Sequence, residues 1–162
     1  MKDFEQRLQK AIERGQKVSL ARERAEAERA MSQKELRRLH GRYRLELVEH
    51  IETCLRSLSQ HLDGFRFETL VSESGWGAAI SCDHYPAGPG RRRATSFSRL
   101  EMLVAPISAS AILEITAKAT IHSKEHFNRS YHRPLPDVDL DECREIVDRW
   151  ALEYAELCAA HA

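Results

Sequence analysis

A zinc-protease pattern stands in the last third of the chain. His122-Ser-Lys-Glu125-His126 matches H-x-x-E-H, in which two histidines bind one metal ion and the glutamate acts as the general base. That arrangement works only on a helix, where both histidines can reach the same ion. Here the residues follow an alternating, strand-like run, and 162 residues leave little room for the rest of such an active site. We therefore interpret the match as coincidental.

A looser metal site is an alternative for the same part of the chain. His122, His126 or His132 would combine with Cys82 or His84 if strand ends brought them together. However, no ligand pair has zinc-finger spacing, and eight histidines in 162 residues form loose clusters by accident. We interpret these histidines as surface residues and expect neither a metal ion nor a cofactor.

Signatures of the common catalytic and nucleotide-binding sites are missing. The chain contains no G-x-S-x-G, no Walker loop and no G-x-G-x-x-G. An active site assembled from residues far apart in the sequence is an alternative hypothesis, and His84, Tyr85 and His122 are the polar groups that such a site would use. We favour a protein without enzymatic activity and assign no catalytic residue, with a small ligand-binding or enzymatic head as one alternative.

Basic residues offer a different chemistry, the binding of anions. Arg91, Arg92 and Arg93 lie on a loop rich in glycine and proline, and Arg37, Arg38 and Arg42 lie in a basic helical stretch. Phosphate contacts need only lysine and arginine. Glutamates interleave with the helical arginines, which is more typical of a solvated helix or a coiled-coil flank. Nucleic-acid or polyanion binding is therefore an alternative, not the first hypothesis.

The overall net charge of zero hides two halves of opposite sign. Residues 1–44 contain 13 Lys/Arg and 7 Asp/Glu, so the remainder of the chain is acidic. Such a distribution favours head-to-tail association or an anionic partner at the basic end. The four cysteines form no C-x-x-C pair and are expected to be buried free thiols. No signal peptide and no run long enough to span a membrane are apparent, so we expect a cytoplasmic protein without membrane contact.

Residues 2–31 consist mainly of good helix formers. Phe4 begins a series of small or apolar residues that recurs every seven positions, and the partner positions four residues later include Gly15, Arg22 and Arg29. This seam is too weak for a strong coiled coil and predicts a helix that needs a partner. The predicted partner-facing residues are Phe4, Leu8, Ala11, Val18, Ala25, Leu36, Leu39 and Tyr43.

Ser32 leaves two alternatives for the path of this helix. Ser32-Gln-Lys-Glu35 is a capping-box pattern that would start a new helix. The flanking residues contain no glycine, proline or turn cluster, so we favour one continuous helix that ends at Asp63-Gly64.

Period-two patterns follow the helix and predict four strands. The inward-facing residues are expected to begin with Phe65, Trp76, Leu100 and Leu113 in successive strands. A clean alternation in residues 111–122 implies a sheet with one solvated face, so helices must cover the other. The segment from Ser123 to Asp137 is expected to be a polar linker. Asp139 is expected to cap a C-terminal helix with an apolar stripe.

These elements predict an α+β fold in which a four-stranded antiparallel meander is covered on one face by helices. We expect a helical stalk for oligomerisation over residues 1–41 and a helix-β-β-β-β-helix head over residues 42–162. The leading hypothesis is a cytoplasmic oligomerisation or adaptor protein that binds a second copy, as a homodimer, or another protein through its N-terminal coiled-coil helix.

Overall fold

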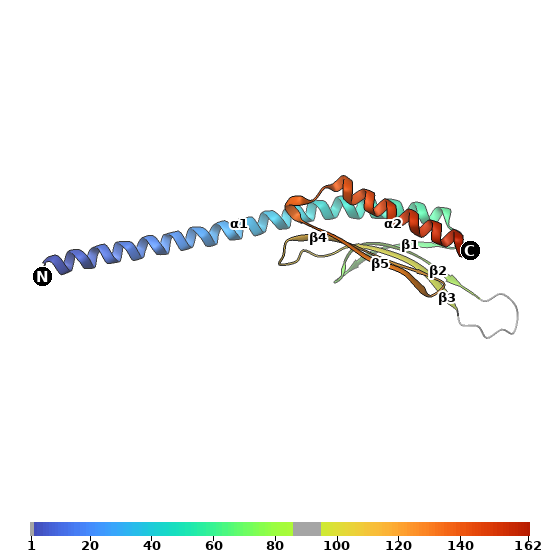
Figure 1. Ribbon diagram of the computed structural model, residues 1–162, viewed down its shortest axis with the longest axis horizontal. Helices are drawn as coiled ribbons and strands as arrows, with labels where there is room; N and C mark the ends of the chain where they lie inside the picture. Colours follow the sequence, from blue (N-terminus) through green and yellow to red (C-terminus); the bar gives the residue numbers. More distant parts are fainter. Residues whose placement is uncertain (1, 86–94) are drawn as a thin grey trace. The chain divides into compact units, whose positions relative to one another are not determined.

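The structure, a computed structural model, describes residues 2–85 and 95–162. In chain order its elements are α1 (Lys2–His61), β1 (Arg66–Ser72), β2 (Gly75–His84), β3 (Ser96–Val104), β4 (Ile112–Ile121), β5 (Lys124–Pro134), a 3-10 helix (Leu135–Asp137) and α2 (Leu140–Ala160) (Figure 1). The chain divides into two compact units, residues 1–38 and residues 39–162. We call these the N-terminal segment and the α+β unit.

Helix α1 is continuous from Lys2 to His61, so the favoured prediction of one long helix is confirmed. Ser32 lies inside α1 and does not begin a separate helix, because none of its neighbours interrupts the backbone hydrogen bonds. The helix ends where Gly64 adopts a left-handed backbone with φ of 82°. Glycine takes that conformation without steric cost, which lets the chain turn back into β1.

The sheet confirms the predicted antiparallel meander and α+β class, but it has five strands where four were predicted. Each strand pairs with the next one along the chain, in the order β1-β2-β3-β4-β5. The additional strand is β5, which occupies most of the segment from Ser123 to Asp137 that is predicted to be a polar linker. That linker prediction was wrong.

The residues of β5 explain why its pattern is hard to see in the sequence. Its helix-facing side alternates aromatic and basic residues, with the Arg129 guanidinium 4.4 Å from the Phe127 ring centre and that of Arg133 4.5 Å from the Tyr131 ring centre. Arginine side chains stacked on rings cover apolar surface as aliphatic residues would. The β4–β5 turn is equally hard to recognise in the sequence, because His122 and Ser123 adopt the positive φ values for which glycine or asparagine is usual.

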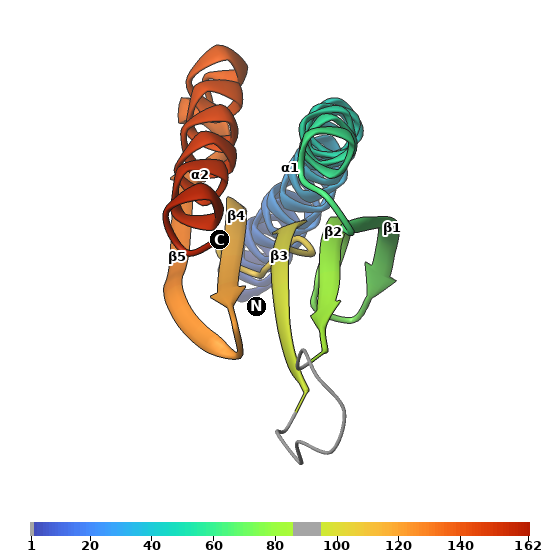
Figure 2. The same cartoon turned by 90° about the vertical axis from the view of Figure 1, so that its right-hand side faces the viewer.

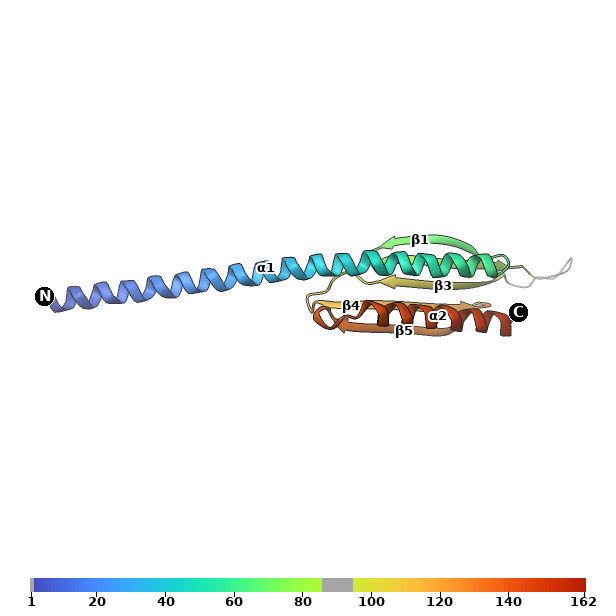
Figure 3. The same ribbon diagram turned by 90° about the horizontal axis from the view of Figure 1, so that it is seen from above.

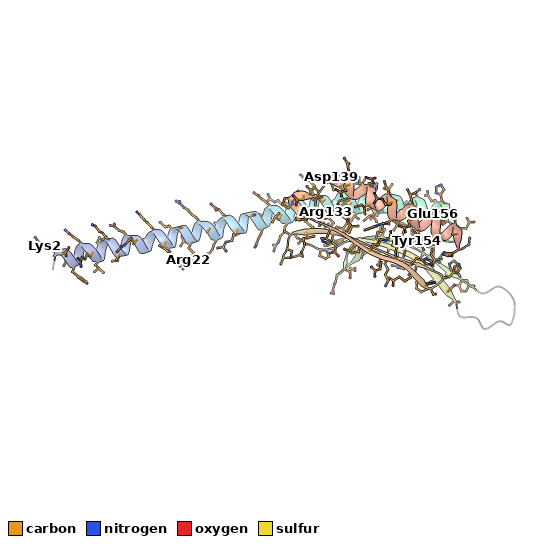
Figure 4. The ribbon with its side chains drawn as sticks, viewed as in Figure 1. Lys2, Arg22, Arg133, Asp139, Tyr154 and Glu156 are labelled. Carbon is orange, nitrogen blue, oxygen red and sulfur yellow. The ribbon has the colours of Figure 1, made fainter. Side chains whose placement is uncertain are left out.

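Both helices of the α+β unit lie on the same face of the sheet (Figures 2 and 3). On the α1 side, the Arg56 guanidinium stacks on Phe67 of β1 and that of Arg44 stacks on Trp76 of β2. On the α2 side, the Tyr154 hydroxyl donates to the Thr120 carbonyl of β4 at 3.0 Å, and Tyr154 points toward the sheet (Figure 4). Helix α1 therefore covers the first strands and α2 covers the last ones.

The core lies between this face and the two helices. Predicted inward positions of β2, β3 and β4 are buried as expected, except Trp76 of β2, which is half-buried, and Val71 of β1 is 79% exposed. Asp139 caps α2 as predicted, its carboxylate accepting hydrogen bonds from the Asp141 and Glu142 amides. The largest fully buried side chains are Leu47, Ile51, Leu55, Ile80, Leu100, Met102, Val104, Leu113, Ile115, Leu135, Val147 and Tyr154.

Gly77 allows β2 and β3 to approach closely. A Cβ atom at this position would lie 1.9 Å from the Met102 carbonyl oxygen, whereas a Cβ at Gly41 of α1 would meet nothing within 4 Å. Gly77→Ala should therefore lower the free energy of unfolding by about 1–3 kcal/mol or more, because backbone must move to accommodate the methyl group. Gly41→Ala is the matched control and should raise it by about 0.5–1 kcal/mol. Urea denaturation measures both, and an unchanged midpoint for Gly77→Ala would contradict the tight β2–β3 packing.

His40 joins α1 to the chain after β3, since its Nε2–H donates to the Ala105 carbonyl oxygen at 3.1 Å. Burial lowers the pKa of His40, the Ala105 hydrogen bond raises it, and the Arg44 guanidinium lowers it further, so that the net direction is downward. The folded state therefore binds fewer protons at His40 than the unfolded state does, and stability should fall as the pH drops below about 6.5. His40→Gln, whose amide can still donate to Ala105, should lose less stability than the wild type between about pH 8 and about pH 5.5. Equal losses in urea midpoint for the two proteins would refute this role.

Candidate functional site

The apolar residues of the N-terminal segment are exposed to solvent. Every residue from 2 to 30 is exposed, and the exposed fractions of Phe4, Leu8 and Val18 are 65%, 49% and 59%. Side chains of this segment, Lys2 and Arg22 among them, extend outward from the helix axis (Figure 4). Large apolar side chains at regular spacing on a helix are typical of a surface that another protein covers.

The predicted partner-facing residues fall into two groups. Phe4, Leu8, Ala11, Val18 and Ala25 are exposed, whereas Leu36, Leu39 and Tyr43 are half-buried. Two further exposed apolar residues, Ile12 and Leu20, were missed because a seven-residue repeat does not include them. The α-helical spacing of about 100° per residue places Ile12 beside the seam and Leu20 roughly opposite Phe4.

The basic residues proposed for anion binding are only partly within the described chain. Arg37, Arg38 and Arg42 of α1 are exposed, and the Arg42 guanidinium lies 5.5 Å from the Tyr43 ring centre. Among the described residues these three arginines form no ion pair; the N-terminal segment shows a single one, between Arg7 and Asp3 at 3.7 Å. Arg91, Arg92 and Arg93 lie outside the described residues.

The structure separates the histidines of the protease-like pattern. His122 lies in the β4–β5 turn and His126 in β5, so neither histidine lies on the helix that this pattern needs. The His122 ring lies beside that of His84, with ring centres 4.2 Å apart, whereas the His126 ring lies beside that of His161 at 4.8 Å; both pairs are tilted. His132 is exposed elsewhere on β5.

His84 and His122 lie at one end of the sheet, beside a cavity of about 310 Å³ that His61 and His161 also line. His84 Nε2 is 2.8 Å from the Ser98 hydroxyl. Burial lowers the pKa of His84 and the neighbouring His122 lowers it further, while Asp83 raises it. Tyr85, the third polar group considered for a ligand site, is 76% exposed. These positions place a histidine pair beside a cavity, with His84 in contact with the Ser98 hydroxyl.

A second polar cluster lies between α1 and α2, and sequence reasoning missed it. His50 Nε2 is 2.7 Å from Asp148 Oδ1, and the Cys54 thiol donates to the same oxygen at 3.2 Å. Cys54 Sγ is also 3.6 Å from His50 Nε2, so three potential ligand atoms converge on one point. A cavity of about 550 Å³ opens beside them, lined by Cys54 and Asp148 together with Thr53, Ser57, Leu58, His61, Ala151, Leu152 and Ala155.

The electrostatics of this cluster argue against a free cysteine nucleophile. Burial raises the pKa of the Cys54 thiol to about 12, with further contributions from the hydrogen bond and charge of Asp148. A reactive cysteine needs the opposite shift. The geometry also differs from a catalytic triad, in which one imidazole nitrogen faces the nucleophile and the other faces the carboxylate. Here one nitrogen faces both.

One sequence signal for this cluster exists. His50 and Cys54 are four residues apart on a helix, which places them on the same face. Asp148 is 98 residues from His50, and only the docking of α2 beside α1 brings it into place.

Within the described residues, none of the helices combines the length and the apolar character that crossing a membrane requires. Comparison with known proteins adds no relative: no family model, no curated protein and no solved structure matches this chain.

Proposed function

We propose that the protein is a self-association module, in which residues 2–38 of α1 pair with the same segment of a second copy. The observation that carries this proposal is the complete exposure of residues 2–30, apolar residues included. An isolated helix with so much exposed apolar surface gains stability by burying it, and helix pairing is the arrangement in which a seven-residue repeat does so.

Charge and side-chain size support a second copy as the partner. Acidic residues are interleaved with more numerous basic ones along the segment, yet its only ion pair among the described residues joins Arg7 to Asp3. A second identical helix supplies charges of both signs to pair with the remainder. Ala11, Gly15 and Ala25 in the seam allow close approach, whereas Arg22 and Arg29 weaken it. The expected complex is a reversible dimer.

Glutamate substitutions on the two sides of the helix test this proposal. Leu8→Glu combined with Val18→Glu places charge in the seam and should weaken dimerisation at least about tenfold, because two buried apolar contacts are lost. Leu20→Glu is the matched control: its side chain is 57% exposed on the other side of the helix, and dimerisation should be unchanged. Sedimentation equilibrium over a range of protein concentrations measures the dissociation constant.

A chain that starts at Ser32 retains the whole α+β unit and should be monomeric. A monomeric mass for the full-length protein at all concentrations up to about 100 µM would overturn self-association, since even a weak dimer forms there. A full-length monomer that gains mass only with a different protein would assign the seam to a hetero-complex instead.

Nucleic-acid binding is a second candidate because Arg37, Arg38 and Arg42 are exposed and form no ion pair among the described residues. Reversal of all three to glutamate should weaken binding to duplex DNA and reduce the slope of log affinity against log salt by about 2–3. Reversal of Lys10, Arg14 and Lys17 changes the charge equally and shows whether position matters. Filter binding at several salt concentrations measures these slopes, and wild-type protein that shows no salt-sensitive retention would remove this candidate.

A further inference from the structure

The groove between α1 and α2 holds a set of atoms whose types and spacing suit a metal ion. His50 and Cys54 lie one turn apart on α1, and Asp148 reaches them from α2, so imidazole nitrogen, thiol sulfur and carboxylate oxygen face one another. All three ligand atoms lie within 4.8 Å of one another. The three residues belong to the α+β unit, and the inference below is independent of the proposed self-association.

The distances can be compared with those that zinc requires. A tetrahedral zinc ion about 2.3 Å from sulfur and about 2.0–2.2 Å from nitrogen and oxygen would hold its ligand atoms roughly 3.4–3.6 Å apart. The observed sulfur–nitrogen separation of 3.6 Å already fits. The two separations that involve the Asp148 oxygen, 2.7 and 3.2 Å, are shorter. Asp148 must therefore withdraw by roughly half an ångström, which its 49% exposed side chain permits.

We propose that His50, Cys54 and Asp148 bind a zinc ion. Zinc accepts mixed nitrogen, sulfur and oxygen ligands, and three protein ligands leave a fourth tetrahedral position for water. A cavity of about 550 Å³, to which Cys54 and Asp148 both contribute, lies beside the cluster and offers room for that water. On binding, the metal replaces the thiol proton of Cys54, which is released to solvent.

The charges around the cluster favour a cation. Glu46 and Glu49 of α1 line a separate cavity of about 380 Å³, to which His50 also contributes. Arg144, the arginine in that lining, is already paired with Glu46 at 3.2 Å and with Asp141 at 3.1 Å. A positive ion at His50, Cys54 and Asp148 would therefore meet a net acidic surrounding.

The competing explanation is a hydrogen-bonded contact that only holds α1 against α2. In that case His50 and Cys54 donate to Asp148, and no ion is needed. The two explanations differ in what happens when metal is supplied, because only the first requires the sulfur to become a ligand.

Metal titration of the full-length protein after treatment with a chelator distinguishes them. Zinc should bind with one equivalent in calorimetry and should raise the melting temperature. Cobalt(II), as a spectroscopic substitute, should show the near-ultraviolet absorption of a cobalt–thiolate bond. Cys54→Ser should abolish this absorption and weaken zinc binding by at least about 100-fold, since even loss of an outer partner of a metal site costs about 10–100-fold.

Asp148→Asn guards against a trivial loss of folding. The asparagine keeps the size of the side chain and an oxygen that can accept from His50 and Cys54, and far-ultraviolet circular dichroism in the presence of chelator checks that the protein remains folded. Its zinc affinity should fall by at least about tenfold. Unchanged zinc affinity in folded Cys54→Ser and Asp148→Asn, or no zinc binding by the wild type, would overturn the proposal.

Two control variants locate the metal. Cys158→Ser removes the other half-buried cysteine, which lies in α2. The double variant His84→Ala, His122→Ala removes the paired histidines at the end of the sheet. Both should retain one equivalent of zinc and the thiolate absorption. If either control loses them while Cys54→Ser retains them, the metal binds at the end of the sheet and the assignment to His50, Cys54 and Asp148 is wrong.

Discussion

The apolar face of the sheet has to be shielded from water, and the rest of the α+β unit depends on this requirement. Ile80, Leu100 and Ile115 come from three adjacent strands and are fully buried. Burying a side chain of this size contributes about 1.5–3 kcal/mol, so an uncovered face would leave the sheet unstable. Helix α1 and helix α2 provide the cover, with Leu47, Ile51, Leu55, Val147, Trp150 and Tyr154 buried on them.

Much of this arrangement is predictable because burial of one face of a helix or strand produces a periodic spacing of apolar residues in the sequence. The continuous helix, the capped C-terminal helix and the first four strands follow from spacing, glycine positions and the Asp139 cap. Strand β5 does not, since arginine takes the places where aliphatic residues would reveal an inward face. Arg129 and Arg133 cover the Phe127 and Tyr131 rings and also pair with Glu153 and Glu142 of α2. The sequence of an edge strand that packs through such pairs therefore resembles that of a polar linker.

The two candidate sites also differ in how far the sequence reveals them. The exposed seam of Phe4, Leu8 and Val18 belongs to one helix, so its spacing is present in the sequence. The cluster of His50, Cys54 and Asp148 needs the packing of α2 beside α1. The four-residue spacing of His50 and Cys54 is present in the sequence, but no local pattern supplies Asp148, which is 98 residues from His50. It lies between the two helices, where the His50 and Asp148 side chains are 25% and 49% exposed.

The meander has a consequence for biosynthesis. Neighbouring strands follow one another along the chain, so the sheet can pair progressively as the ribosome releases it. Helix α2, which covers β4 and β5, is translated only after all five strands. The apolar face of β4 and β5 therefore stays uncovered until α2 emerges, and nascent chains at this stage are the ones that a chaperone would bind or that would aggregate.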